Sequence, residues 1–158
     1  MGRSNFEELE VYQLSETVAD RVWELVHEWP QFAKSSLGNQ LVRSADSIGA
    51  NIAEGVGQKT TGANRYHVRI ARGSLYETKH WLQRAYRRDL LTDEQVAELK
   101  PLLDELAPRL NAYLNSIGQS LIVDGWSLAV DCGLAAVGDR GERKSYNQQS
   151  TDNNKLFQ

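Results

Sequence analysis

The stretch "GVGQKTTG", residues 55–62, holds the residue types that cradle a phosphate: closely spaced glycines, a lysine and two threonines. A nucleotide P-loop requires G-x-x-x-x-G-K-[ST], but Gln58 stands directly before Lys59, and Ala53 occupies the position of the first glycine. A dinucleotide fingerprint requires G-x-G-x-x-G, and Thr60 occupies its third glycine position. Both phosphate motifs fail, so we interpret the stretch as a link between two helices.

Acid–base and metal chemistry lack the necessary combinations of residues. His27, His67 and His80 do not recur at the E-x-x-H or H-x-x-x-H spacing of a metal site in a helical bundle. Glu54 has no neighbouring histidine, cysteine or second acid with which to share a proton, and Cys132 is the single cysteine. We therefore expect no catalytic residues, no metal and no cofactor, and a protein that is not an enzyme.

Basic residues concentrate in the middle of the chain. Residues 37–91 carry nine Lys/Arg and four Asp/Glu, although the whole chain has a net charge of −3. Helical spacing places several of these cations near one face, with Tyr66 and Tyr76 close by for stacking on bases. The candidate nucleic-acid-binding residues are Arg43, Lys59, Arg65, Arg69, Arg72, Lys79 and Arg87. The alternative is that these side chains form a solvated face or pair with acidic helices.

Helical periodicity accounts for the first 120 residues. It predicts helices over about 4–29, 36–57, 62–89 and 92–117, joined by short connections. Thr92 and Gln95 stand at capping-box spacing before the last helix, as do Ser4 and Glu7 before the first. Pro108 falls inside the last helix, where we expect a bend. The prediction is an all-α, antiparallel up-down-up-down four-helix bundle over residues 1–120.

Residues 121–158 form a C-terminal extension that we expect to be largely disordered. Its second half, from about residue 139, is polar and has no periodicity, whereas residues 119–137 are apolar but interrupted by glycines and aspartates. At 158 residues, 41% of them hydrophobic, the chain suits one domain, and it has no apolar run long enough to cross a membrane. We expect a soluble, cytoplasmic protein with no membrane partner.

Small residues recur every fourth position in the second predicted helix, and this spacing allows another helix or subunit to approach closely. A comparable small-residue notch lies in the third helix, and Asn51 and Glu54 stand beside the ridge as candidates for polar contacts across it. The predicted contact residues are Ala45, Gly49, Asn51, Ala53, Glu54 and Gly57 in the second helix, and Ala71, Gly73 and Ser74 in the third.

These same two helices carry a family resemblance. "SIGANIAEGVG", residues 47–57, preceded by Arg43, and "IARGSLYE", residues 70–77, resemble the signature of the 23S rRNA intervening-sequence proteins. The resemblance implies an antiparallel four-helix bundle that assembles as a ring-shaped homopentamer. Related proteins include the accessory protein of diversity-generating retroelements, which binds reverse transcriptase and RNA.

Two functions remain open from the sequence. The first is a non-enzymatic homopentameric module that binds structured RNA or a ribonucleoprotein. The alternative is a retroelement accessory protein that binds a reverse transcriptase, although the accessory proteins it resembles are basic overall and this chain is acidic.

Overall fold

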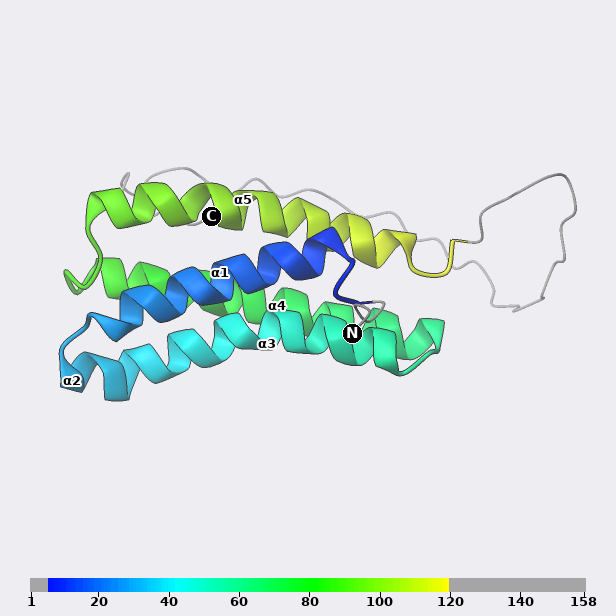
Figure 1. Ribbon diagram of the computed structural model, residues 1–158, viewed down its shortest axis with the longest axis horizontal. Coiled ribbons are helices and arrows are strands. Elements are labelled where there is room, and N and C mark those ends of the chain that lie inside the picture. Colours follow the sequence, from blue (N-terminus) through cyan, green and yellow to red (C-terminus); the bar gives the residue numbers. More distant parts are fainter. Residues whose placement is uncertain (1–5, 120–158) are drawn as a thin grey trace, which may run out of the picture.

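The protein is a bundle of four long helices, seen in a computed structural model that describes residues 6–119 (Figure 1). The elements are α1 (Glu10–His27), α2 (Gln31–Ala33), a π-helical turn η1 (Lys34–Gly38), α3 (Asn39–Gly57), α4 (Thr61–Tyr86) and α5 (Asp93–Ser116). No strand occurs within residues 6–119, which confirms the all-α prediction. The predicted extension over residues 121–158 lies outside the described residues.

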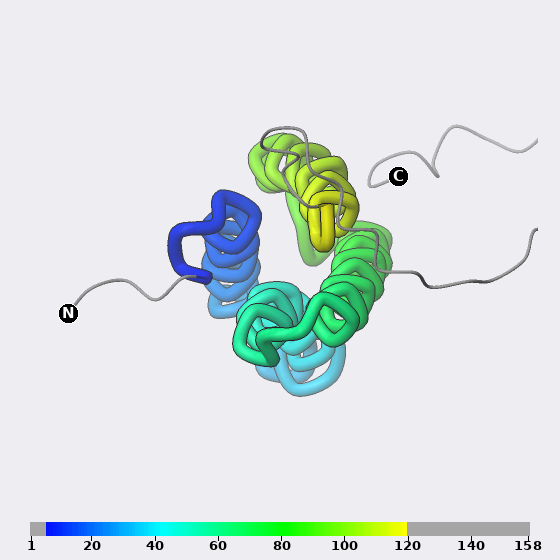
Figure 2. Tube along the Cα trace, turned by 90° about the vertical axis from the view of Figure 1, so that its right-hand side faces the viewer, coloured from blue at the N-terminus to red at the C-terminus, as the bar shows by residue number. Residues whose placement is uncertain are grey.

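The four long helices form a square in which each contacts two neighbours. α1 packs against α3 and α5, and α4 packs against the same two helices, so that α1 lies diagonally opposite α4 (Figure 2). Successive long helices run in opposite directions, as the prediction of an up-down-up-down bundle requires (Figure 1). The most extensive contact is between α3 and α4, the two helices that carry the sequences resembling the family signature.

Side-chain caps explain two helix starts. At α5, Thr92 and Gln95 form the predicted capping box: Thr92 Oγ1 accepts from the Gln95 amide, and Gln95 Oε1 accepts from the Thr92 amide. At α4, the hydroxyl of Thr60 accepts from the Ala63 amide. α5 then continues through Pro101 and Pro108 to Ser116 without interruption.

Two predicted boundaries are wrong. The first long helix starts at Glu10 rather than near Ser4, and its N-cap, Leu9, makes no side-chain capping bond. The second helical segment starts at Gln31, earlier than predicted, because α2, η1 and α3 follow one another with helical backbone angles at the junctions. Pro30 stands at its N-cap, where the missing amide hydrogen is no loss.

One hydrophobic core runs through the bundle and takes aliphatic side chains from every long helix. It agrees with the helical periodicity of the sequence, since the fully buried large side chains are Val18, Val22, Leu41, Ile48, Ile52, Val68, Leu75, Leu82, Leu99, Leu103, Leu106 and Leu110. No described helix is long and apolar enough to cross a membrane. The core thus fixes which faces of α3 and α4 point outward, and these outward faces are where binding residues must lie.

Candidate binding surfaces

The predicted basic stripe on α4 is divided between structural and exposed positions. Arg65 Nη1 donates to the backbone carbonyls of Leu114 (3.2 Å) and Ile117 (2.9 Å), at the C-terminal end of α5. A cation here satisfies carbonyls that have no partner within the helix and favours the negative end of the helix dipole. Arg65 therefore ties α4 to α5, and its contact with RNA stays a prediction.

Two further members of the stripe also point toward the bundle. Arg72 Nη1 donates to Asn111 Oδ1 on α5 at 3.3 Å. Lys79 is only 8% exposed and makes no hydrogen bond or ion pair within the described residues. The helical repeat of 3.6 residues places Arg72 and Lys79 on the same side of α4 as Arg69. The repeat does not predict where the neighbouring helix lies.

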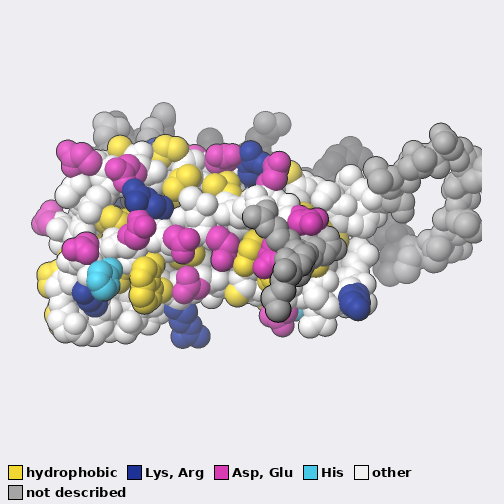
Figure 3. All heavy atoms as spheres, viewed as in Figure 1, with side chains coloured by type: hydrophobic (Ala, Val, Ile, Leu, Met, Phe, Trp, Pro, Cys, Tyr) yellow, Lys and Arg dark blue, Asp and Glu magenta, His cyan; other side chains and the backbone are white. Residues whose placement is uncertain are grey.

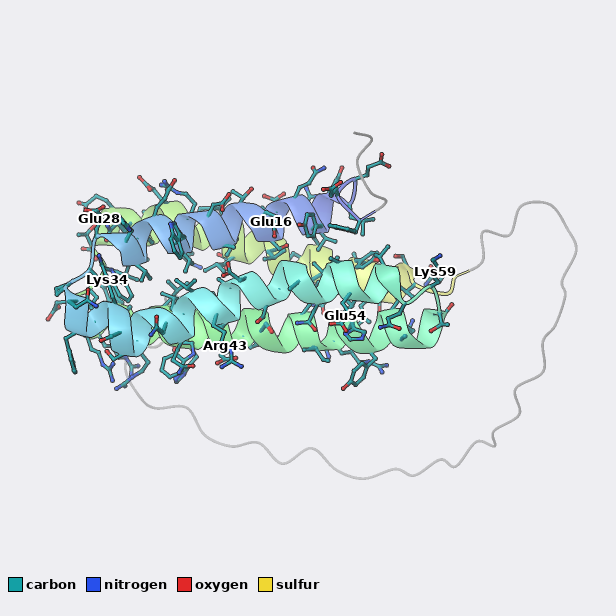
Figure 4. All side chains as sticks on the ribbon, turned by 60° about the horizontal axis from the view of Figure 1, so that its bottom comes forward. Glu16, Glu28, Lys34, Arg43, Glu54 and Lys59 are labelled. Atoms are coloured by element: carbon teal, nitrogen blue, oxygen red, sulfur yellow. The ribbon has the colours of Figure 1, made fainter. Side chains whose placement is uncertain are left out.

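The other predicted cations are exposed, and they lie apart from one another. Arg43, Lys59 and Arg69 form no ion pair within residues 6–119, and Arg87 is exposed as well. Arg43 lies along α3, whereas Lys59 lies at the end of the bundle in the turn before α4 (Figure 4). Lys59 has a left-handed backbone, with φ of 58°, so this turn places its positive φ on a lysine rather than on one of the nearby glycines.

Exposed aromatic side chains accompany Arg69 on the outer face of α4. Tyr66 is 60% exposed and Tyr76 is 62% exposed, and the apolar side chain of Ile70 is 38% exposed between them. Gly73 lies on the same face, with nothing within 4 Å of the position of an added Cβ. We call Tyr66, Arg69, Ile70, Gly73 and Tyr76 the α4 outer face. Arg69 and Ile70 are adjacent, and steps of three residues connect this pair to Tyr66 on one side and to Gly73 and Tyr76 on the other, so the five residues lie along one surface of the helix.

The predicted small-residue ridge on α3 proves to be two contacts with different helices. Ala45 and Gly49 are buried, and a Cβ at Gly49 would stand 2.5 Å from Glu16 Oε1 and 3.1 Å from Ser15 Oγ, both on α1. The close-approach prediction is confirmed at Gly49. Gly57 is exposed, and no atom of the described chain lies within 4 Å of its Cβ position, so its contact with another helix or subunit stays a prediction.

Close contact between α3 and α4 instead uses Gly55, which is buried. A Cβ there would stand 2.7 Å from Asn64 Oδ1, 3.1 Å from His67 Cβ and 3.2 Å from the Asn64 carbonyl oxygen. Ala53 is half-buried. The predicted notch on α4 is correct in part, because Ala71 and Ser74 are buried whereas Gly73 faces outward. Gly55 is not one of the small residues that recur every fourth position. Because it begins the stretch "GVGQKTTG", its sequence context predicts a place in the link between two helices.

The polar contact residues also differ from expectation. Asn51 Nδ2 donates to the Ser47 carbonyl of its own helix at 2.7 Å rather than across a contact. Glu54 does face the neighbouring helix, with Oε2 3.5 Å from His67 Nδ1 on α4. The polar link in the buried α3–α4 contact is one that sequence reasoning missed: Thr78 Oγ1 lies 3.1 Å from Ser44 Oγ and donates to the Ser74 carbonyl at 2.8 Å.

Acidic side chains dominate another part of the surface. Figure 3 shows Asp and Glu side chains gathered over α1 and α5, with few Lys or Arg side chains among them. Two arginines form ion pairs between these helices. Arg109 of α5 pairs with Glu10 of α1 at 2.5 Å, and Arg21 of α1 pairs with Glu98 of α5. The α1–α5 surface is therefore unsuited to a polyanion.

A groove between α1 and α3 is a feature that the sequence did not indicate. It has a volume of about 520 Å³. Trp23, Val26 and His27 line it from α1, Lys34 from η1, and Val42, Arg43, Asp46 and Ala50 from α3. We call it the α1–α3 groove. Trp23 is 61% exposed, and Figure 3 shows hydrophobic side chains at the surface between these two helices.

Charged side chains line the α1–α3 groove without ion-pair partners among the described residues. Partial burial, and secondarily the negative charge of Asp20, raise the pKa of the Asp46 carboxyl above its usual value. Lys34 and Arg43, at the same groove, have no ion-pair partner within residues 6–119. The groove thus combines an apolar floor with unpaired charges of both signs. Elsewhere, no group of three or more described His, Cys, Asp or Glu side chains is placed to hold a metal ion.

Comparison with known proteins places this architecture in a family. A crystal structure of a protein of unknown function from the S23 ribosomal protein family of Bacteroides thetaiotaomicron VPI-5482 is similar, with a TM-score of 0.59 and 25% sequence identity. The similarity covers 66% of this chain and 95% of that one. No curated protein matches the chain. The model of the 23S rRNA-intervening sequence protein family matches residues 7–112, which span nearly all of the bundle, and the chain therefore belongs to the 23S rRNA-intervening sequence protein family.

Proposed function

We propose that this protein is a non-enzymatic, homo-oligomeric helical module that binds RNA or a ribonucleoprotein through the α4 outer face. The observation that carries the proposal is the position of Arg69, an exposed cation without an ion-pair partner in the described chain, on the same face as the exposed rings of Tyr66 and Tyr76. Aromatic rings stack on unpaired bases, and a nearby guanidinium adds phosphate contacts and cation–π attraction.

Oligomerisation would make this modest surface effective. One Arg69 contributes little against a chain with a net charge of −3, but a ring of copies repeats the cation and both tyrosines at regular intervals. The resemblance to a family of ring-shaped pentamers supports this arrangement. The side chain of Phe32, which is 83% exposed, also suits an assembly, since contact with another copy would remove this large apolar surface from water.

Binding to a structured RNA with single-stranded loops, measured at several salt concentrations, tests the proposal. Tyr76→Ala removes a stacking ring, and since stacking contributes about 1–3 kcal/mol per base, we expect at least a roughly fivefold loss of affinity. Arg69→Ala should weaken binding and flatten its salt dependence. Lys100→Ala on α5 is the matched control, because its ammonium already pairs with Asp104 at 2.7 Å.

Native mass measurement completes the test by giving the number of copies in the assembly. A monomer at micromolar concentration would contradict the homo-oligomeric part of the proposal. Equal RNA affinity for the wild type, Tyr76→Ala and Arg69→Ala would contradict the assignment of the α4 outer face. Absence of any binding at low salt would contradict RNA as the ligand.

A protein client is the second candidate, and the place of the exposed apolar residues favours it. Trp23 on α1 and Phe32 on α2 belong to different elements from the α4 cations, and large apolar side chains suit a protein partner better than a polyanion. A reverse transcriptase is the client that the family resemblance suggests. Co-purification with a reverse transcriptase encoded beside this gene, lost in Phe32→Ser, is the result that this candidate requires.

A further inference from the structure

We propose that the chain's own C-terminal segment, residues 121–137, docks in the α1–α3 groove. The inference concerns a surface away from the α4 outer face and holds whether or not that face binds RNA. It rests on the composition of the segment, the reach of the chain and the chemistry of the groove.

The segment needs a surface to cover it. From Leu121 to Val137, 12 of 17 residues are apolar, and Asp124 and Asp131 are the only charged ones. Chains of fewer than about 40 residues rarely bury enough surface to fold alone. The 17 residues of the segment are therefore too few to build a core of their own around these side chains. The apolar segment is therefore most stable against a surface that the bundle already provides.

The groove provides such a surface, with matching chemistry. Its volume of about 520 Å³ is lined by Val26, Val42 and Ala50, with the exposed indole of Trp23 at one side. Trp126 is the largest apolar side chain of the segment and the natural anchor, because buried aromatic side chains supply the largest share of contact energy.

Charge complementarity points to the same pairing. Both charges of the segment are negative. Three Lys, Arg, Asp or Glu side chains line the groove: one is Asp46, and the other two, Lys34 and Arg43, are cations without an ion-pair partner within residues 6–119. Asp124 and Asp131 would supply those partners. The acidic α1–α5 surface would repel the same aspartates (Figure 3).

The chain is long enough to reach. The position of a Cβ at Gly118 lies 2.7 Å from Thr61 Cγ2, so the described chain ends beside the start of α4. Ala50, at the nearer end of the groove, precedes Gly57 by seven residues, or about 10 Å along α3. The 13 residues from 120 to 132 span up to about 45 Å when extended, which allows for a crossing between helices as well.

The single native cysteine makes the docking measurable in the full chain. Cys132 lies inside the segment, and Ala50→Cys places a second thiol at the groove wall, at an exposed position. Under mild oxidation at low protein concentration we expect an intramolecular disulfide between positions 50 and 132. Ala112→Cys is the matched control: an exposed alanine of α5, close to where the extension begins.

Comparing the rates at which Cys132 forms a disulfide with position 50 and with position 112 distinguishes a docked segment from a freely moving one. An undocked extension samples the nearer position 112 at least as often as position 50, whereas a docked one forms the 50–132 disulfide at least tenfold faster. Trp126→Ala and Trp23→Ala should each remove that preference without unfolding the bundle, since Trp23 is exposed and the bundle is built from residues 6–119, which do not include Trp126. Equal or faster reaction at position 112 overturns the proposal, and so do disulfides that are only intermolecular, which would assign the groove to a second copy.

A spectroscopic measurement needs no substitution. A nitroxide attached to Cys132 of the wild-type chain should broaden the indole N–H signal of Trp23 and leave that of Trp81, on α4, sharp. An unbroadened Trp23 signal in the monomeric or assembled protein contradicts docking in the α1–α3 groove.

Discussion

Gly55 of α3 lies directly against Asn64 of α4: a Cβ at position 55 would stand 2.7 Å from Asn64 Oδ1 and 3.2 Å from the Asn64 backbone carbonyl. The absence of a side chain at this one position lets the two helices with the family signature approach each other at their joined ends. A side-chain atom can move aside, but the carbonyl belongs to the helix backbone and moves only with α4. This contact leads to the first of four predictions.

Gly55→Ala should destabilise the protein, and Gly73→Ala should stabilise it. At position 55 the added methyl group forces the helices apart, and overpacking of this kind costs about 1–3 kcal/mol, more than the gain in helix propensity. At position 73 the methyl group meets nothing within 4 Å, so the propensity gain of about 0.5–1 kcal/mol remains. Urea unfolding of both variants measures the difference, and an equal response at the two glycines would contradict the contact.

Gly49→Leu should lower the free energy of unfolding by about 1–3 kcal/mol, because its side chain enters the α1–α3 contact beside Ser15 and Glu16. Since these neighbours belong to the same chain, the variant should lose thermal stability at every protein concentration. A loss that appears only where the protein assembles would mean that Gly49 contacts another subunit instead.

Arg65→Ala and Arg69→Ala should separate a structural arginine from a binding one. Loss of the two hydrogen bonds from Arg65 to the Leu114 and Ile117 carbonyls should destabilise the bundle by about 1–2 kcal/mol, in the range for a charged donor. Arg69 makes no ion pair in the described chain, so Arg69→Ala should change stability by less than about 0.5 kcal/mol. Thermal unfolding checks both, and equal losses would show that Arg69 is structural too.

Asp46→Asn should raise stability at neutral pH and lose this advantage in acid. Because the pKa of Asp46 is raised in the folded chain, its ionised form is less favourable there than in the unfolded chain. At pH 7 the variant should therefore be more stable, by no more than about 0.5 kcal/mol, since the side chain remains partly in water. The difference should shrink as the pH falls through the raised pKa and vanish below the unfolded value of about 3.9. Unfolding curves at pH 7 and pH 3 test it, and a destabilised variant at pH 7 would reverse the assignment.

Periodicity and motif together determined the architecture. Helical periodicity predicted the four helices, because a 3.6-residue repeat brings apolar side chains such as Leu41, Ile48 and Ile52 to one buried face. The Thr92–Gln95 box predicted the start of α5, since both hydrogen bonds are local. The signature around residues 47–57 and 70–77 predicted the family.

What only the tertiary structure decided is which neighbour each side chain meets. Arg65 and Arg69 are one helical turn apart and equivalent in sequence, yet one bonds α5 and the other faces outward, because α5 covers one side of that stripe and not the other. Gly49, Gly55, Gly57 and Gly73 are likewise the same residue type, but only the first two have another helix within contact distance. Spacing along a chain gives the direction of a side chain around its own helix axis, whereas the position of the next helix depends on the packing of the whole core.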